Sequence, residues 1–371
     1  MPPAAWFSTP MPLSLPSFTL FRRPRPLVGL DIGSSAVKAV ELRPAGKGFK
    51  VAAFASEPVP PDAIVDGAII DGTAVAEAIR RLFEQHGFKA RDVAASLSGN
   101  AVIVKKISLP VMTSQELAES IHWEAEQYIP FDIQDVNLDY QVLDPGGADG
   151  KGNMEVLLVA AKKEKIADYT GVIAQAGRTA VVVDVDAFAL QNAFELNYGL
   201  DPSLVTVLLN AGASATNVNI VVGEQSIFTR DISLGGNAYT EAVQRELNLP
   251  FEGAEDAKRG HPVEGVSFED VRPVLRATTE NVLLEIQKTF DFFKTTTGYD
   301  RIDRVMLCGG ASRVDGFAEA LHERFGAPVE MLDPFKTVEL DAARLGIEQP
   351  ADVAPTAAVA VGLAVRRVGD R

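Results

Sequence analysis

Residues 28–38 read V-G-L-D-I-G-S-S-A-V-K, which sets one acid, one glycine and two serines between two apolar segments. The residues that follow alternate apolar and polar side chains, and this period of two predicts a second strand and no helix. Strand, turn and strand form a β-hairpin, in which Gly33 relieves the steric cost of the turn. The hydroxyls of Ser34 and Ser35 and the N–H groups of the turn can face an anion. Asp31 ends the first strand, where its carboxylate could hold a water on Mg²⁺.

The same pattern returns half a chain later. Residues 209–219 read L-N-A-G-A-S-A-T-N-V-N, and alignment with the first stretch places Gly212 on Gly33 and Ser214 on Ser35. One such pattern also fits an ordinary hairpin. Two of them predict two similar lobes, each with a turn that can hold a nucleotide's phosphates.

Two further stretches fit a site between lobes. Residues 305–317 read V-M-L-C-G-G-A-S-R-V-D-G-F, a strand followed by paired glycines and the start of a helix. Paired glycines let a backbone approach a flat ligand closely. Residues 354–365 read A-P-T-A-A-V-A-V-G-L-A-V, which predicts a helix of small residues that can pack closely at a hinge.

Composition limits the class of protein. A chain of 371 residues is too long for one compact core, so we expect two lobes with insertions. The net charge of −15 argues against broad nucleic-acid binding, which needs a basic face. The single cysteine, Cys308, excludes an internal disulfide and fits a reducing compartment.

Residues 1–26 contain seven prolines, which break any helix long enough to span a bilayer. We expect a disordered Pro-rich extension; the alternative is a weak membrane-surface foot that uses Trp6, Phe7, Phe18 and Phe21. No other stretch approaches 18 uninterrupted apolar residues, so no transmembrane span is expected.

The order of these elements over about residues 27–368 resembles the actin-like ATPase superfamily. Three stretches are similar to its PilM family, the cytoplasmic assembly proteins of type IV pili: P-L-V-G-L-D-I-G-S-S-A-V-K-A-V-E-L, E-A-E-Q-Y-I-P-F-D-I-Q-D-V-N-L-D-Y-Q-V-L and V-M-L-C-G-G-A-S-R-V-D-G-F. The resemblance implies an α/β, two-lobed actin-like ATPase fold with a small α+β subdomain inserted in the first lobe. The expected parts are a first lobe of residues 27–92, 187–203 and 353–371, a partner-binding insert of residues 93–186, and a second lobe of residues 204–352.

The resemblance also implies ATP and Mg²⁺ between the lobes. The first phosphate region would be Asp31, Gly33, Ser34, Ser35 and Lys38, with Asp31 also at the metal, and the second Gly212, Ala213, Ser214 and Thr216. Gly309, Gly310 and Ser312 would flank the adenosine. Glu255 and Lys258, three apart on one face of an expected helix, would contact the ribose and adenine; a surface ion pair is the alternative.

One departure from the superfamily concerns catalysis. Asn210 stands where the superfamily usually has an acid, and an amide cannot accept a proton as a carboxylate does. Asp31 is then the one clear acid expected at the phosphates, and Asp31 and Asn210 are the candidate catalytic residues. Nucleotide binding with at most slow ATP hydrolysis is therefore expected.

The insert carries its own signals. Thr113 and Glu116 form a capping box at the start of a helix that Pro130 ends, and a hairpin with a loose loop follows. The resemblance implies that a groove on this insert takes the N-terminal cytoplasmic tail of a PilN-like membrane protein. The candidate contacts are Tyr128, Ile129 and Phe131, for which core packing is the alternative.

These features favour a cytoplasmic, ATP-binding scaffold, peripheral at the inner membrane, in the assembly platform of a type IV pilus or type II secretion system. Other platform proteins and the motor ATPase would be indirect partners, and a homo-oligomer is possible. The alternatives are a division protein similar to FtsA or a small-molecule kinase of the same fold. FtsA would end in a linker and an amphipathic helix, whereas this chain stops at V-R-R-V-G-D-R. A kinase would need a general base that the sequence does not supply.

Overall fold

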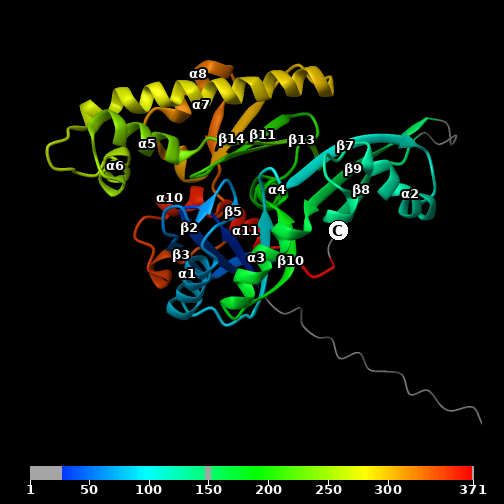
Figure 1. Ribbon diagram of the computed structural model, residues 1–371, viewed down its shortest axis with the longest axis horizontal. Helices are drawn as coiled ribbons and strands as arrows, with labels where there is room; N and C mark the ends of the chain where they lie inside the picture. Colours follow the sequence, from blue (N-terminus) through cyan, green and yellow to red (C-terminus); the bar gives the residue numbers. More distant parts are fainter. Residues whose placement is uncertain (1–26, 147–151, 370–371) are drawn as a thin grey trace, which may run out of the picture.

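A computed structural model describes residues 27–146 and 152–369, and Figure 1 shows their arrangement. The expected extension, residues 1–26, lies outside the described residues. Within the described ranges, none of the helices combines the length and the apolar character needed to cross a membrane.

The first lobe is built on a five-stranded sheet in the order β10-β6-β1-β2-β3. Its strands are β1 (Val28–Ile32), β2 (Ala36–Ala45), β3 (Gly48–Pro58), β6 (Asp92–Leu97) and β10 (Thr179–Val185). Strands β1 and β2 form the expected antiparallel hairpin, β3 pairs antiparallel with β2, and β6 pairs parallel with both β1 and β10. The small strands β4 (Ile64–Val65) and β5 (Ala68–Ile69) pair beside this sheet. Helices α1 (Gly72–Gln85) and α3 (Lys163–Gln175) cover one of its faces.

The second lobe repeats this topology, with the order β13-β12-β11-β14-β15. Its strands are β11 (Val205–Ala211), β12 (Thr216–Val222), β13 (Gln225–Ile232), β14 (Arg304–Cys308) and β15 (Val329–Met331). Its outer helices are α5 (Gly236–Leu247), α6 (Phe251–Lys258), α7 (Phe268–Thr297) and α8 (Phe317–Phe325), with the 3₁₀ turn η2 (Gly310–Arg313). The matching strand orders agree with the two similar lobes expected from the repeated hairpin.

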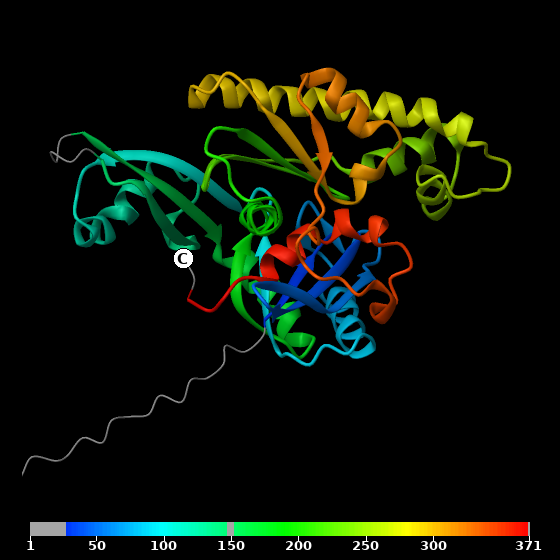
Figure 2. The ribbon, with the colours of Figure 1, turned by 180° about the vertical axis from the view of Figure 1, so that it is seen from behind.

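The inserted subdomain projects to the side of the two lobes (Figures 1 and 2). It has a three-stranded sheet in the order β7-β9-β8, made of β7 (Val102–Pro110), β8 (Val136–Asp144) and β9 (Asn153–Lys162). Helix α2 (Ser114–Glu126) and the 3₁₀ turn η1 (Ile133–Asp135) complete it. The predicted capping box is present, because Thr113 and Glu116 bond each other's backbone N–H groups.

The strand pairing differs from the predicted insert boundaries of 93 and 186. Strands β6 and β10 pair with each other, and β6 also pairs with β1 in the first-lobe sheet. Helix α3 packs in the core of the same lobe. Strand β6 is buried on both faces, as a central parallel strand must be, and an insert of only three strands could not cover it. The insert therefore spans only about residues 99–162.

Two helices lie between the two sheets: α4 (Asp186–Tyr198) and α11 (Ala358–Ala364), which Figure 2 shows near the centre of the molecule. Three short segments, α9 (Ala342–Leu345), α10 (Pro350–Val353) and η3 (Ala354–Thr356), lead from the second lobe to α11. Leu190 and Phe194 of α4 pack with Leu208 and Met306 of the second sheet, and α11 also packs on β1 and β2. The sheets of both lobes therefore pack against this helix pair.

Small residues let α11 approach its neighbours very closely. A Cβ atom added to Gly362 would lie 1.6 Å from the carbonyl oxygen of Ala189 on α4. A Cβ atom added to Gly29 on β1 would lie 2.0 Å from the carbonyl oxygen of Ala360. Both obstacles are backbone atoms, so the packing has no flexible side chain that could give way.

Adding one methyl group at this crossing should destabilise the whole fold. We expect Gly362→Ala to lower the free energy of unfolding by at least ~3 kcal/mol, the upper end of the usual cost of overpacking. The matched control is Gly171→Ala on α3, where an added Cβ meets no atom within 4 Å. The control should gain ~0.5–1 kcal/mol, because alanine favours a helix over glycine. Urea unfolding followed by circular dichroism measures both, and equal stabilities for the two variants would contradict the close packing.

Candidate functional site

The two glycine turns face each other across the lobes and touch. The hydroxyl of Ser34 in the first turn lies 3.0 Å from that of Ser214 in the second. Each turn closes in the same way: the N–H of Gly33 donates to Ala36 O at 3.1 Å, and the N–H of Gly212 donates to Ala215 O at 2.9 Å. A Cβ at Gly212 would lie 2.8 Å from that same carbonyl oxygen, so the turn itself requires this glycine.

Behind the turns, the two hairpins have the same register but different chemistry. In the first, Asp31 is paired with Lys38, whose Nζ lies 3.0 Å from the Asp31 carboxylate. Both side chains are only 15% exposed. In the second, the equivalent pair is Asn210 and Asn217, and Asn210 Nδ2 donates to Asn217 Oδ1 at 3.0 Å. The first lobe thus offers an ion pair, and the second offers neutral amides.

A second acid lies beside Asp31, which corrects the expectation that Asp31 is the one clear acid at the phosphates. Asp186 is the first residue of α4 and accepts a hydrogen bond of 2.5 Å from Ser96 Oγ. Burial, together with the nearby Asp31 charge, raises the pKa of Asp186 to about 6, although bonds from Ser96 and Ser98 oppose the shift. The signal available in the sequence was an acid directly after the apolar strand V-V-V-D-V, at the first turn of a helix.

Lys165 on α3 and Asp231 on β13 complete the charged set, and neither was predicted from the sequence. Lys165 Nζ donates to the carbonyl oxygen of Ser98. Burial lowers the pKa of Lys165, while the Asp186 and Asp231 carboxylates act in the opposite direction. Lys165, Asp186 and Asp231 come from three separate elements, so no local motif in the sequence joins them.

The expected adenosine-side pair, Glu255 and Lys258, lies against the start of α5. Lys258 Nζ lies 2.5 Å from the Glu255 carboxylate and also donates to Thr240 Oγ1 at 2.9 Å. Burial lowers the pKa of Lys258; for Glu255, burial acts to raise the pKa but is outweighed by Lys258, so the pKa is lowered. The N–H of Gly236, the first residue of α5, donates to Gly212 O at 2.9 Å. This pair is therefore joined to the second turn through α5.

Several expected contact residues support the turns with their side chains. Thr216 is fully buried, and its hydroxyl donates to Leu234 O at 2.7 Å. Ser312 is buried, and its hydroxyl donates to Gly309 O at 2.6 Å. Gly309 has φ +89°, and a Cβ there would lie 2.2 Å from Ala211 O, so this glycine is needed by the fold. Gly310 differs, because a Cβ there meets no atom within 4 Å.

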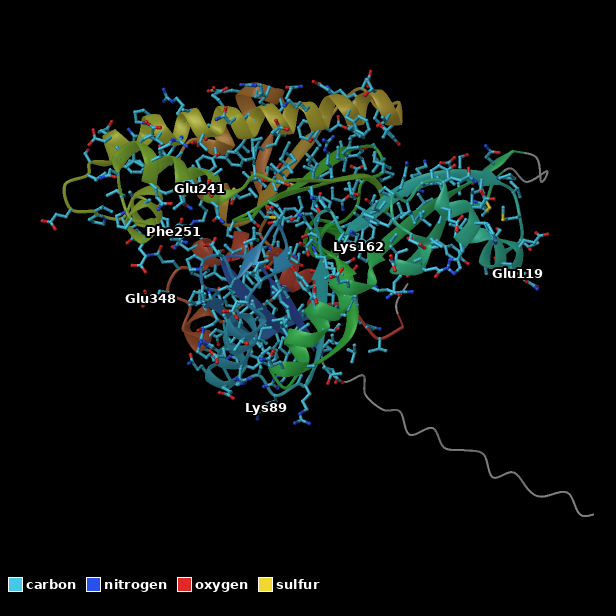
Figure 3. The ribbon with its side chains drawn as sticks, viewed as in Figure 1. Lys89, Glu119, Lys162, Glu241, Phe251 and Glu348 are labelled. Atoms are coloured by element: carbon cyan, nitrogen blue, oxygen red, sulfur yellow. The ribbon has the colours of Figure 1, made fainter. Side chains whose placement is uncertain are left out.

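The expected partner contacts divide into core and surface. Ile129 is buried in the core of the insert, which makes it a packing residue and corrects its prediction as a partner contact. Tyr128 and Phe131 are half-buried, and Lys105 Nζ and Lys162 Nζ lie over their rings at 5.2 and 4.3 Å from the centroids. Figure 3 shows Lys162 where the insert meets the lobes, and Glu119 at its far end.

The chain matches one family along nearly its whole length. The sequence profile of the family described as type IV pilus assembly protein PilM matches residues 29–368. A solved structure, described as a PilM-PilN type IV pilus biogenesis complex, matches with a TM-score of 0.80 and 31% sequence identity. The match covers 93% of this chain and 99% of that chain.

More distant matches agree on the fold. The cell division protein FtsA of Enterococcus hirae is 24% identical over 352 residues, which is 83% of this chain and 78% of that protein. The ethanolamine utilization protein EutJ of Carboxydothermus hydrogenoformans matches with a TM-score of 0.54 and 17% identity, covering 92% of this chain and 90% of that chain. The two-lobed actin-like ATPase fold expected from the sequence is confirmed.

The raised pKa of Asp186 predicts how stability changes with pH. Because the folded protein holds this proton up to about pH 6, whereas an ordinary aspartate has a pKa of 3.8, stability falls as pH rises between these values. Asp186→Asn removes the charge, so we expect it to raise the free energy of unfolding by ~1–3 kcal/mol near neutral pH. This gain should shrink toward zero near pH 4.

Thermal unfolding in EDTA without nucleotide, repeated from pH 4 to 8, measures the difference. The control is Asp168→Asn on the exposed side of α3, which should stay within ~0.5 kcal/mol of wild type throughout. A gain for Asp186→Asn that is the same at every pH would contradict the raised pKa.

Proposed function

The chain belongs to the family of type IV pilus assembly protein PilM, and from this premise we propose that it is a cytoplasmic, ATP-binding scaffold at the inner-membrane assembly platform. In this proposal it serves a type IV pilus, or a type II secretion system, and binds the N-terminal tail of a PilN-like membrane protein. The observation that carries the nucleotide part is the contact of Ser34 with Ser214, which brings two equivalent turns together from opposite lobes.

The residues at these turns fit a triphosphate. Each turn presents backbone N–H groups and serine hydroxyls, and such concave sets of donors bind anions. The first turn adds the ammonium group of Lys38, held 3.0 Å from Asp31. A Cβ at Gly235, just before α5, would lie 2.6 Å from both Gly212 O and Ala213 O, so the start of α5 is held tightly against the second turn. Phosphates between the turns would then be bonded from both lobes.

The donor set also fits a hydrated magnesium ion. Among residues 27–146 and 152–369, no three His, Cys, Asp or Glu side chains are close enough together to hold a metal ion by themselves. Mg²⁺ usually keeps several waters and is bound by one or two carboxylates and the substrate's phosphates. Asp31 and Asp186, with the amide oxygen of Asn210, would accept hydrogen bonds from such waters. Bound MgATP would supply a γ-phosphate that is activated for attack by water.

The same residues predict slow hydrolysis. Asn210 can orient a water but cannot take its proton. Asp186, with a pKa of about 6, is the acid best suited to accept a proton near neutral pH. Its carboxylate is already bonded to Ser96, however, which limits it as a base. We therefore propose turnover below ~1 s⁻¹, the lower end of typical enzymes.

The partner part of the proposal rests on the insert. The solved structure described as a PilM-PilN complex matches 93% of this chain, a share too large to leave out the insert. Strand β8 pairs with β9 on one side, and its other edge has no partner strand within the described residues. An extended tail could add to such an edge through backbone hydrogen bonds. Tyr128 and Phe131 would contact its apolar side chains.

The alternatives have less support. FtsA is similar to this chain at 24% identity, below the 31% of the PilM-PilN match. A small-molecule kinase would need a base for the acceptor hydroxyl as well as a substrate pocket. The acid found beside Asp31 does not change this, because the nucleotide's own metal and water would already engage Asp186.

Nucleotide binding can be tested at a position where the fold has free space. Gly310→Val should lower MgATP affinity at least tenfold, because the added side chain would occupy the space we assign to adenosine. The matched control, Gly171→Val, also has open surroundings but lies on α3 and should bind as wild type does. Calorimetry measures affinity, and the free energy of unfolding without nucleotide should stay within ~1 kcal/mol for both variants. Equal affinity of wild type and Gly310→Val would place the adenosine elsewhere.

Partner binding can be tested with a synthetic peptide that carries the N-terminal cytoplasmic residues of the PilN-like protein from the same genome. Tyr128→Ala and Phe131→Ala should each weaken peptide binding about tenfold, equal to ~1.4 kcal/mol. The control is Leu284→Ala, which removes an exposed leucine on α7 of the second lobe. Fluorescence anisotropy with the full chain measures all four proteins. Unchanged affinity in both aromatic variants would move the peptide site away from this surface.

A further inference from the structure

Asp231, near the end of β13, uses its two carboxylate oxygens for two different parts of the molecule. Oδ1 accepts a hydrogen bond of 2.7 Å from Asn217 Nδ2, in the second hairpin. Oδ2 accepts a hydrogen bond of 2.5 Å from the backbone N–H of Gly99, in the link between β6 and the insert. One side chain on the second lobe is thus bonded to both the phosphate region and the root of the inserted subdomain.

The carboxylate decides which way two amides point. An ionised carboxylate can only accept hydrogen bonds, so Asn217 must turn its NH₂ group toward Asp231. The oxygen of Asn217 then faces Asn210, whose NH₂ group donates to it at 3.0 Å. The oxygen of Asn210 accepts a hydrogen bond from the Cys308 thiol, whose sulfur lies 3.7 Å away. Burial and the nearby Asp31 charge raise the pKa of that thiol, so it stays protonated.

The direction in which the Asn210 amide points matters for a bound Mg²⁺ ion. A water bound to Mg²⁺ is a hydrogen-bond donor, so its protein partner must offer an oxygen. The Asn210 amide could be flipped, and the chain from Asp231, together with the Cys308 thiol, keeps its oxygen away from Asn217, where it can accept a second hydrogen bond. The neutral side chain of Asn210 thus supplies an oxygen acceptor at a position where a carboxylate would also supply one.

We propose that Asp231 is a positioning residue that couples the nucleotide site to the inserted subdomain. Through Asn217 it fixes the orientation of the Asn210 amide beside the phosphate turns, and it holds the root of the insert through Gly99. The inference rests on the proposed binding of MgATP and adds a route by which that binding reaches the partner surface.

The root of the insert is held by hydrogen bonds from both lobes, and the bond from Gly99 to Asp231 is one of them. Lys162 N donates to Ala101 O at 3.0 Å, which ties the two ends of the insert together. Lys165 on the first lobe holds Ser98 O, next to Gly99. Gly99 has φ +81°, a conformation that few other residues adopt. The joint therefore lies between a lysine of the first lobe and an aspartate of the second.

The Asp231 contact can break and form again. Asp231 lies at an exposed position, where water competes for its oxygens. If MgATP draws the lobes together, the bond to Gly99 should become more persistent. Thermodynamic reciprocity then requires that fixing the insert also changes MgATP affinity.

Two measurements on the full-length chain test the coupling. The variant Asp231→Ala removes both contacts, and Glu224→Ala removes an exposed acid from the turn of the same hairpin as the control. Calorimetry compares ATP affinity with Mg²⁺ and with EDTA. Hydrogen exchange follows the amides of residues 98–104 with and without MgATP.

We expect Asp231→Ala to weaken ATP binding about tenfold with Mg²⁺ but not with EDTA. Exchange at residues 98–104 should be faster in this variant and should no longer respond to MgATP, whereas Glu224→Ala should match wild type. An equal loss of affinity with and without Mg²⁺, or an unchanged exchange response, would overturn the inference alone. Failure of the wild type to bind ATP under either condition would overturn the proposed function, and the inference with it.

Discussion

The structure depends on how closely α11 can approach α4 and β1. The distances of 1.6 and 2.0 Å from added Cβ atoms at Gly362 and Gly29 to backbone oxygens show that only hydrogen atoms fit there. The two helices form the layer between the sheets, so their separation sets the spacing of the lobes. That spacing brings the turns at Ser34 and Ser214 to hydrogen-bond distance. A wider crossing would leave two separate hairpins, and neither could bind both sides of a phosphate chain.

The two hairpins show how one backbone can carry different chemistry. Asp31 and Lys38 in the first lobe occupy the register positions of Asn210 and Asn217 in the second. An acid at every one of these positions would place several like charges around the triphosphate that we propose to bind there, which is itself anionic. The neutral amides avoid that repulsion, but they lose the ability to accept a proton. The acid at the start of α4, Asp186, partly restores this ability, and its pKa of about 6 reflects its burial beside Asp31.

The inserted subdomain is joined to the lobes at a narrow root. Its own core is complete, with Leu117, Ile121 and Ile129 buried against β7 and β9. At its root, Val102 of β7 and Ala161 of β9 also pack against the first-lobe core. Lys165 and Asp231 hold the root from opposite lobes, so any change in the angle between the lobes acts directly on it.

The sequence by itself determined the hairpins, their repeat and the fold, because turns and strand alternation depend on near neighbours in the chain. Gly33, Gly212 and the capping box of Thr113 with Glu116 are local signals of this sort. The tertiary structure alone decided that β6 and β10 belong to the first sheet and that Ile129 is a core residue. It also decided that Asp186, Lys165 and Asp231 meet beside Asp31, since they lie on three elements far apart in sequence. Charge clusters and burial arise from long-range packing, which no short stretch of residues encodes.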